Sequence, residues 1–116
     1  MYIYQRKIQK RIDDKFFQGK IITILGPRQS GKTTLSKTLI EPFKENGMYF
    51  NCELLDIRNH LIERQPELLY EKIKRYKIVV LDEAQTVENI GLILKNFIDT
   101  YTDIQIIATG SSSFDL

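Results

Sequence analysis

The segment from Lys20 to Thr34 constrains the fold more than any other part of the chain. Its first residues, KIITIL, contain the continuous β-branched run IITI, which predicts a strand buried on both faces, as in parallel sheets. The following residues, GPRQSGKT, fit the pattern G-x-x-x-x-G-K-[ST] of a phosphate-binding loop. A helical pattern begins at about Gly31, so the motif lies between a strand and a helix, where such a loop has to lie.

Each residue type in this loop has a chemical reason to be there. Glycines allow backbone conformations that turn successive amide N–H groups inward around a polyphosphate. The start of the helix after Gly31 adds unpaired N–H donors and the positive end of the helix dipole. Lys32 is expected to reach the β- and γ-phosphates, and the Thr33 hydroxyl to ligate Mg²⁺. Thr34 could add a hydroxyl to the α-phosphate.

A second motif, YKIVVLDEAQ, places Asp82 and Glu83 at the end of another apolar strand. Open α/β sheets bind their ligands at the carboxyl ends of strands. Asp82 therefore suits a Mg²⁺ partner opposite Thr33, holding the ion through water. Glu83 can orient and deprotonate a water for attack on the γ-phosphate. The competing interpretation is that Asp82 and Glu83 are a helix cap and a surface acid.

A third motif, ATGSSS, ends the strand IQIIA. Thr109 or Ser111 could hydrogen-bond the γ-phosphate or the attacking water, although a Gly/Ser-rich loop start explains either residue equally well. The candidate catalytic residues are Glu83, Lys32 and Thr109, and the candidate metal ligands are Thr33 and Asp82. The candidate nucleotide-binding residues are Gly26, Pro27, Arg28, Gln29, Ser30, Gly31, Lys32, Thr33, Thr34 and Ser111.

The rest of the chain alternates between helical and strand patterns. The expected helices are Ile3 to Phe17, a helix from Gly31 that Pro42 ends or kinks at Glu41, one or two helices in Leu54 to Tyr76 with Pro66 in a first turn, and Ile90 to Tyr101. The expected strands are Lys20 to Leu25, Met48 to Asn51, Lys77 to Leu81 and Ile104 to Ala108. This order predicts an α/β fold whose parallel sheet has helices on both faces. Together with the phosphate-binding loop it indicates a P-loop NTPase core, truncated after the fourth strand.

Composition narrows the class of protein but gives no function. The 116 residues suit one domain or a piece of a larger protein, and 42% hydrophobic residues argue against disorder. A single cysteine and the lack of a signal-peptide core favour the reducing cytoplasm, and no apolar run could span a bilayer. The early segment is basic, so nucleic acid is a possible partner, but a solvated helix face explains these charges more simply.

At its three motifs the chain resembles the AAA-type ATPases of the additional-strand, catalytic-glutamate division of P-loop NTPases. More narrowly, it resembles a prokaryotic family that reads close to GPRQxGKTTL, LDEIQ and TGSSS and often carries an uncharacterised or nuclease-like C-terminal domain. The resemblance covers about Gly19 to Ser113. It implies the strand order 5-1-4-3-2, ATP with Mg²⁺, Lys32 and Thr33 on the nucleotide, Asp82 on magnesium, Glu83 as catalytic base and Thr109 or Ser111 as a polar sensor.

Such ATPases usually continue into a fifth strand, an arginine that completes a neighbouring subunit's site, and a helical lid. None of these can be assigned here, so residues 1–116 are expected to be the N-terminal part of an AAA-type domain. Residues 1–18 would form a leading helix, and the lid and the C-terminal domain would be absent. The first strand would then be an exposed edge through which the chain could self-associate as a homo-oligomer.

The leading functional hypothesis is Mg²⁺-dependent binding and hydrolysis of ATP. The alternative is a nucleotide-dependent switch that regulates an attached effector domain, with little turnover of its own. The presence of Glu83 favours hydrolysis, and the missing lid favours binding alone. A GTP switch or small-molecule kinase fits less well, since the chain has no Asn-Lys-x-Asp guanine signature.

Overall fold

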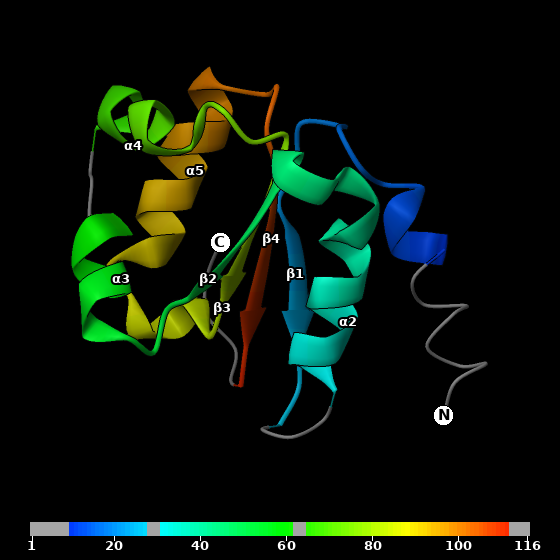
Figure 1. Ribbon diagram of the computed structural model, residues 1–116. Coiled ribbons are helices and arrows are strands. Elements are labelled where there is room, and N and C mark those ends of the chain that lie inside the picture. The colour runs from blue at the N-terminus through cyan, green and yellow to red at the C-terminus, as the bar shows by residue number, and fades with distance from the viewer. Residues whose placement is uncertain (1–9, 28–30, 62–64, 112–116) are drawn as a thin grey trace.

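The computed structural model describes residues 10–27, 31–61 and 65–111, and all that follows concerns these residues (Figure 1). Their centre is a four-stranded sheet in the order β1-β4-β3-β2, and all three pairings are parallel. The strands are β1 (Ile22–Leu25), β2 (Gly47–Asn51), β3 (Ile78–Asp82) and β4 (Gln105–Gly110). The last four positions of the expected order 5-1-4-3-2 are confirmed, and the fifth strand beside β1 stays a prediction.

Helices cover both faces of the sheet, as Figure 1 shows. The helix α2 (Lys32–Ile40) lies on one face, while α3 (Leu55–Leu61), α4 (Pro66–Ile73) and α5 (Ile90–Thr100) lie on the other. Two short 3₁₀ helices, η1 (Glu41–Asn46) and η2 (Ala84–Thr86), complete the described elements. The predicted α/β architecture with a parallel sheet is confirmed. None of the described helices combines the length and apolarity needed to cross a membrane.

The two central strands are buried because both of their faces and both of their edges are covered. Along β3, Val79 and Leu81 belong to the larger apolar cluster under α4 and α5, while Ile78 and Val80 join the smaller cluster under α2. This alternation is the two-residue period of a strand, with an apolar residue at every position because helices flank both faces. The core therefore fixes β3, whose carboxyl end carries Asp82.

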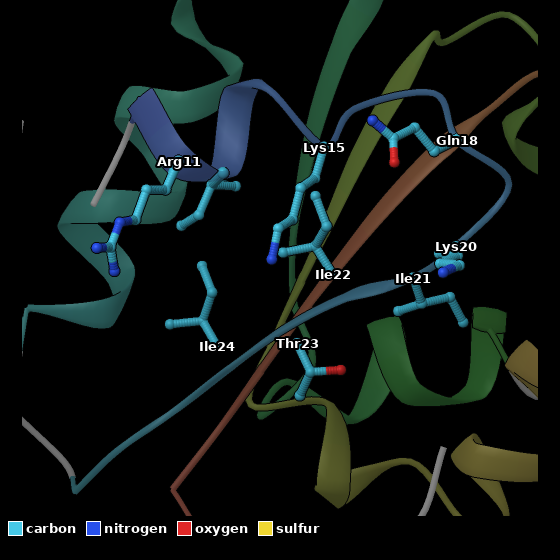
Figure 2. Close-up of a pocket in the computed structure, with 9 residues that line it drawn as sticks. Arg11, Lys15, Gln18, Lys20, Ile21, Ile22, Thr23 and Ile24 are labelled. Atoms are coloured by element: carbon cyan, nitrogen blue, oxygen red, sulfur yellow. The ribbon is translucent and has the colours of Figure 1, made fainter. Parts of the chain in front are cut away.

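The expectation that the first strand is buried on both faces is wrong. Thr23 and Leu25 are exposed, Leu25 by 46%, because β1 pairs only with β4 and forms an edge of the described sheet. A hollow of about 530 Å³ runs along this edge (Figure 2). In Figure 2, Arg11 and Lys15 extend from the N-terminal segment beside Ile22 and Ile24.

The leading helix also ends earlier than expected. Residues 10–13 are helical, but Phe17 has φ 61°, a left-handed conformation that cannot continue a helix. The buried side chain of Gln105 explains this turn: its Oε1 accepts a hydrogen bond from Phe17 N at 2.7 Å, and its Nε2 donates to the Lys20 carbonyl at 3.0 Å. The predicted part before Lys10 lies outside the described residues.

The ends of the remaining elements agree with the sequence within about one turn. The helix α2 ends at Ile40, directly before the residue that precedes Pro42, and Pro66 is the first residue of α4. Proline disfavours the helical conformation in the residue before it but suits a first helical turn. Proline positions were therefore reliable guides to these boundaries.

We expect Leu94→Ala to lower the free energy of unfolding by about 2–5 kcal/mol, because Leu94 on α5 is fully buried in the larger apolar cluster and its removal leaves a cavity. Leu92→Ala on the same helix is the matched control, since Leu92 is 59% exposed and its loss should cost under ~0.5 kcal/mol. Urea denaturation of both variants measures the difference. Equal losses would contradict the assigned orientation of α5.

Candidate functional site

The first two motifs line a cavity of about 400 Å³ at the carboxyl edge of the sheet, and Thr109 and Ser111 of the third motif hydrogen-bond to its two acids. The residues that line it are Gly31, Lys32, Thr33, Thr34, Glu53, Asp82 and Glu83. They come from the start of α2 and from the ends of β2 and β3, the edge at which open α/β sheets bind ligands. Of the predicted loop residues, Arg28, Gln29 and Ser30 lie outside the described residues.

Lys32 is folded back over the loop that precedes it. Its Nζ donates to the carbonyl oxygens of Gly26 at 2.8 Å and Pro27 at 3.0 Å, and lies 3.6 Å from Glu83 Oε2. Only 6% of Lys32 is exposed, so its charge depends on these oxygens for solvation. A phosphate would offer the same ammonium group a stronger, charged acceptor.

The start of α2 suits an anion. Gly31 occupies the N-cap position with φ 88°, a conformation that favours glycine, and no side chain caps the helix there. The first N–H groups of α2 therefore have no side-chain acceptor at the point where the helix dipole is positive. Thr34 faces the same cavity, as its predicted contact with a phosphate requires.

Asp82 is held by hydroxyl groups from three different elements. Thr33 Oγ1 of α2 donates to Oδ2 at 2.8 Å, Thr109 Oγ1 of β4 donates to Oδ1 at 2.5 Å, and the Tyr49 hydroxyl of β2 also donates to Oδ2. Burial alone would raise the pKa of Asp82, but these hydrogen bonds and the charge of Lys32 outweigh it and lower that pKa. The carboxylate is thus kept ionised and fixed in orientation.

Thr109 is fully buried and uses its hydroxyl in both directions. Besides donating to Asp82, its Oγ1 accepts a hydrogen bond from the Glu83 backbone N–H at 3.0 Å. Thr109 therefore ties the end of β4 to both acids of the second motif. Its position inside the protein fits a residue that orients Asp82 and Glu83 better than one that touches a phosphate.

Glu83 has φ 54°, a left-handed conformation, and its side chain is held in a ring of hydrogen bonds. Its Oε1 accepts from Gln85 Nε2 and from Ser111 Oγ, both at 2.8 Å, and Gln85 Nε2 also donates to Ser111 Oγ at 3.1 Å. Burial alone would raise the pKa of Glu83, but the hydrogen bonds from Gln85 and Ser111 and the charge of Lys32 lower it overall.

Three residues of this site were not predicted from the sequence. Tyr49 reaches Asp82 because β2 lies beside β3, a pairing that a local pattern does not reveal. Gln85 follows the second motif by two residues, and its Oε1 is buried without a hydrogen-bond partner among the described residues. Glu53 lines the cavity from the turn after β2, where its backbone N–H donates to Asn51 Oδ1. The acidic residue directly after the run MYFNC was the available signal for Glu53.

The donor set fits a magnesium ion that arrives with a nucleotide. Thr33 Oγ1 and Asp82 Oδ2 converge at the mouth of the cavity, and both are oxygen donors. The described residues contain no group of three or more His, Cys, Asp or Glu residues that could hold a metal by themselves. Magnesium is commonly bound through one or two protein ligands together with phosphates and water, so this pair meets the requirement.

We expect Thr109→Val to lower the free energy of unfolding by ~2 kcal/mol at about pH 7, because it leaves the buried Glu83 N–H unpaired and removes a donor from Asp82. The pKa of folded Asp82 lies below the ordinary value of 3.8, so its charged form stabilises the fold above that value. This stabilisation is lost as the pH falls through the folded pKa of Asp82. The difference in free energy of unfolding between the variant and the parent chain should therefore narrow there.

Urea denaturation at a series of pH values measures this dependence. Thr102→Val is the matched control, because Thr102 is exposed and should change the stability by under ~0.5 kcal/mol at every pH. A deficit for Thr109→Val that stays constant as Asp82 is protonated would contradict the bond to the charged carboxylate.

Comparison with known proteins agrees with this geometry. A search of curated proteins finds no match. A protein-family model described as an AAA domain matches residues 18–116, which span β1 to β4 and every residue of the cavity. The family model and the arrangement of the site on the parallel sheet lead to the same conclusion. The chain belongs to the AAA domain family, which consists of proteins of the P-loop ATPase type.

Proposed function

We propose that the chain binds ATP with Mg²⁺ in the cavity at the carboxyl edge of the sheet and hydrolyses it. The observation that carries the proposal is the convergence of Lys32, Thr33, Asp82 and Glu83 on one cavity. A cationic donor, a hydroxyl–carboxylate pair and a second carboxylate are the groups that phosphoryl transfer to water requires. We also infer that the chain belongs to the prokaryotic group whose motifs read close to GPRQxGKTTL.

In this proposal Lys32 leaves the carbonyl groups of Gly26 and Pro27 for the β- and γ-phosphates, and the amides at the start of α2 bind the phosphate oxygens. Thr33 and Asp82 hold the metal. Bound Mg²⁺ would neutralise charge on the phosphates. The ion pair between Lys32 and Glu83 supports this scheme. A phosphate that draws Lys32 away would also free the Glu83 carboxylate from its pairing with Lys32.

Glu83 acts as the general base. It orients a water and accepts its proton while the water oxygen attacks the γ-phosphorus and ADP leaves. The bonds from Gln85 and Ser111 hold Glu83 before the reaction. Of the two candidate sensors, Ser111 is partly exposed and already bonded to Glu83, so it is better placed than the buried Thr109 to respond to the γ-phosphate. Thr109 then positions the two acids.

The second candidate function is a nucleotide-dependent switch that regulates an attached effector domain. The observation that favours it is the engagement of Glu83 by Gln85, Ser111 and Lys32, which lowers its basicity. No described arginine lines the cavity, and an arginine supplied by a partner is worth ~10³-fold or more in related phosphoryl transfer. Turnover by this chain alone should therefore be slow under either function.

We expect Lys32→Ala to abolish binding of ATP·Mg²⁺, because it removes the only described cation that lines the cavity. Glu83→Gln keeps the shape of the side chain but cannot accept a proton, so it should retain binding and lower the hydrolysis rate by ~10²-fold or more. Calorimetric titration with ATP·Mg²⁺ measures binding, and single-turnover release of phosphate measures hydrolysis.

Lys95→Ala and Glu88→Gln are the matched controls, since both residues are exposed and lie outside the cavity. Both controls should behave as the parent chain. Unchanged binding by Lys32→Ala would overturn the nucleotide site. Unchanged hydrolysis by Glu83→Gln, with binding intact, would overturn the catalytic role of Glu83 and favour the switch.

The exposed edge of β1 supports a further proposal, that copies of the chain associate by pairing along this strand. Unpaired strand edges present a row of N–H and C=O groups to another chain. Thr23 is exposed at the middle of β1, so Thr23→Lys adds a charge where a second strand would pair. Sedimentation at increasing concentration should show oligomers of the parent chain and a weaker tendency in the variant; a parent chain that stays monomeric would overturn the proposal.

A further inference from the structure

A second concave surface lies at the opposite edge of the sheet from the nucleotide cavity. This amino-edge hollow has a volume of about 540 Å³, within the ~300–1,000 Å³ range of ligand sites. Six of the residues that line it are Phe17, Phe43, Lys74, Arg75, Lys77 and Asp103. All come from segments that lead into strands, and parallel strands all begin at the same edge of the sheet, the upper end in Figure 1.

The charge of the amino-edge hollow is predominantly positive. Lys74, Arg75 and Lys77 are all exposed there. Lys74 pairs with Glu71 at 2.9 Å, but both side chains are more than half exposed and such a pair is weak. Arg75 and Lys77 form no ion pair within the described ranges. The one acidic side chain in the lining, Asp103, already accepts a hydrogen bond from the Tyr70 hydroxyl at 2.8 Å.

Two aromatic rings stand beside these cations. Phe17 is 45% exposed, and its ring centroid lies 6.0 Å from that of Phe43, with the planes inclined by 60°. The left-handed backbone conformation of Phe17 is unfavourable for a residue with a Cβ, and the hydrogen bond from Phe17 N to Gln105 Oε1 holds it. The ring of Phe17 is thus partly exposed next to a cluster of positive charge.

The cationic wall is also fixed in place. Lys77 N donates to the Asn46 carbonyl at 2.7 Å, and the Lys77 carbonyl accepts from Gln105 N at 2.9 Å, so its backbone is hydrogen-bonded on both sides. The guanidinium of Arg75 lies 5.3 Å from the centre of the Tyr76 ring. Gln105 therefore anchors both walls of the hollow, through its side chain to Phe17 and through its backbone to Lys77.

We propose that the amino-edge hollow binds single-stranded nucleic acid, with phosphates on Lys74, Arg75 and Lys77 and a base stacked on Phe17. Proteins that bind single-stranded nucleic acid combine cations along the path of the phosphate backbone with exposed aromatic rings on which bases stack. An acidic peptide would use the cations but not the exposed ring of Phe17, and a duplex keeps its base faces covered. The site is separate from the nucleotide cavity and does not rest on the function proposed for it.

The test is fluorescence anisotropy with a labelled oligothymidylate of about 20 nucleotides, titrated with the full chain at ~50 mM salt. Combined Lys74→Gln, Arg75→Gln and Lys77→Gln should weaken binding by about tenfold or more and reduce the slope of log affinity against log salt by about 2. Phe17→Leu keeps an apolar side chain but removes the stacking ring, and should weaken binding by about fivefold or more without changing that slope.

The matched control removes the same number of charges elsewhere, by combined Lys10→Gln, Arg11→Gln and Lys15→Gln in the exposed N-terminal segment. This control should bind the oligonucleotide nearly as well as the parent chain. Equal weakening by the two triple variants would overturn the proposal in favour of general attraction to positive charge. Unchanged binding by Phe17→Leu, or displacement of the oligonucleotide by polyglutamate at equal charge concentration, would overturn it in favour of an acidic polypeptide. Circular dichroism checks that each variant is folded.

Discussion

The hydrogen bond from Thr109 to Asp82 is the interaction on which the rest of the site depends. It joins the ends of the two central strands at a point where both are buried, and the same hydroxyl accepts the Glu83 N–H. An ionised carboxylate at 4% exposure is tolerable only if its oxygens are paired, and three hydroxyl groups supply that pairing. The sheet therefore delivers two acids in fixed positions before any ligand arrives.

Much of this arrangement was predictable because its signals are local. Each signal determines the structure of residues only a few positions away in the sequence. These signals are the apolar runs of β3 and β4, the prolines at helix boundaries and the loop before Lys32. The family assignment then supports the strand order that local patterns leave open. The contacts of Tyr49 and Gln105 could not be predicted in the same way, because they join segments that are distant in the sequence.

The errors have the same origin. A run such as KIITIL is compatible with burial on both faces, but which edges are covered depends on strand neighbours, and β1 has only one among the described strands. The leading helix ends before its apolar spacing does, because Phe17 N donates a hydrogen bond to the side-chain oxygen of Gln105. In both cases a tertiary contact decides what a local pattern cannot.

Backbone strain in the described residues is concentrated at the two edges of the sheet. The non-glycine residues with positive φ are Phe17 and Lys44 in segments before strands, and Glu83 and Asn89 after β3. Glycine adopts this conformation without strain, but at Glu83 it would also remove a buried side chain that accepts hydrogen bonds from Gln85 and Ser111. A homologue adapted to high temperature that keeps side chains at these positions would therefore show how strongly those side chains are needed.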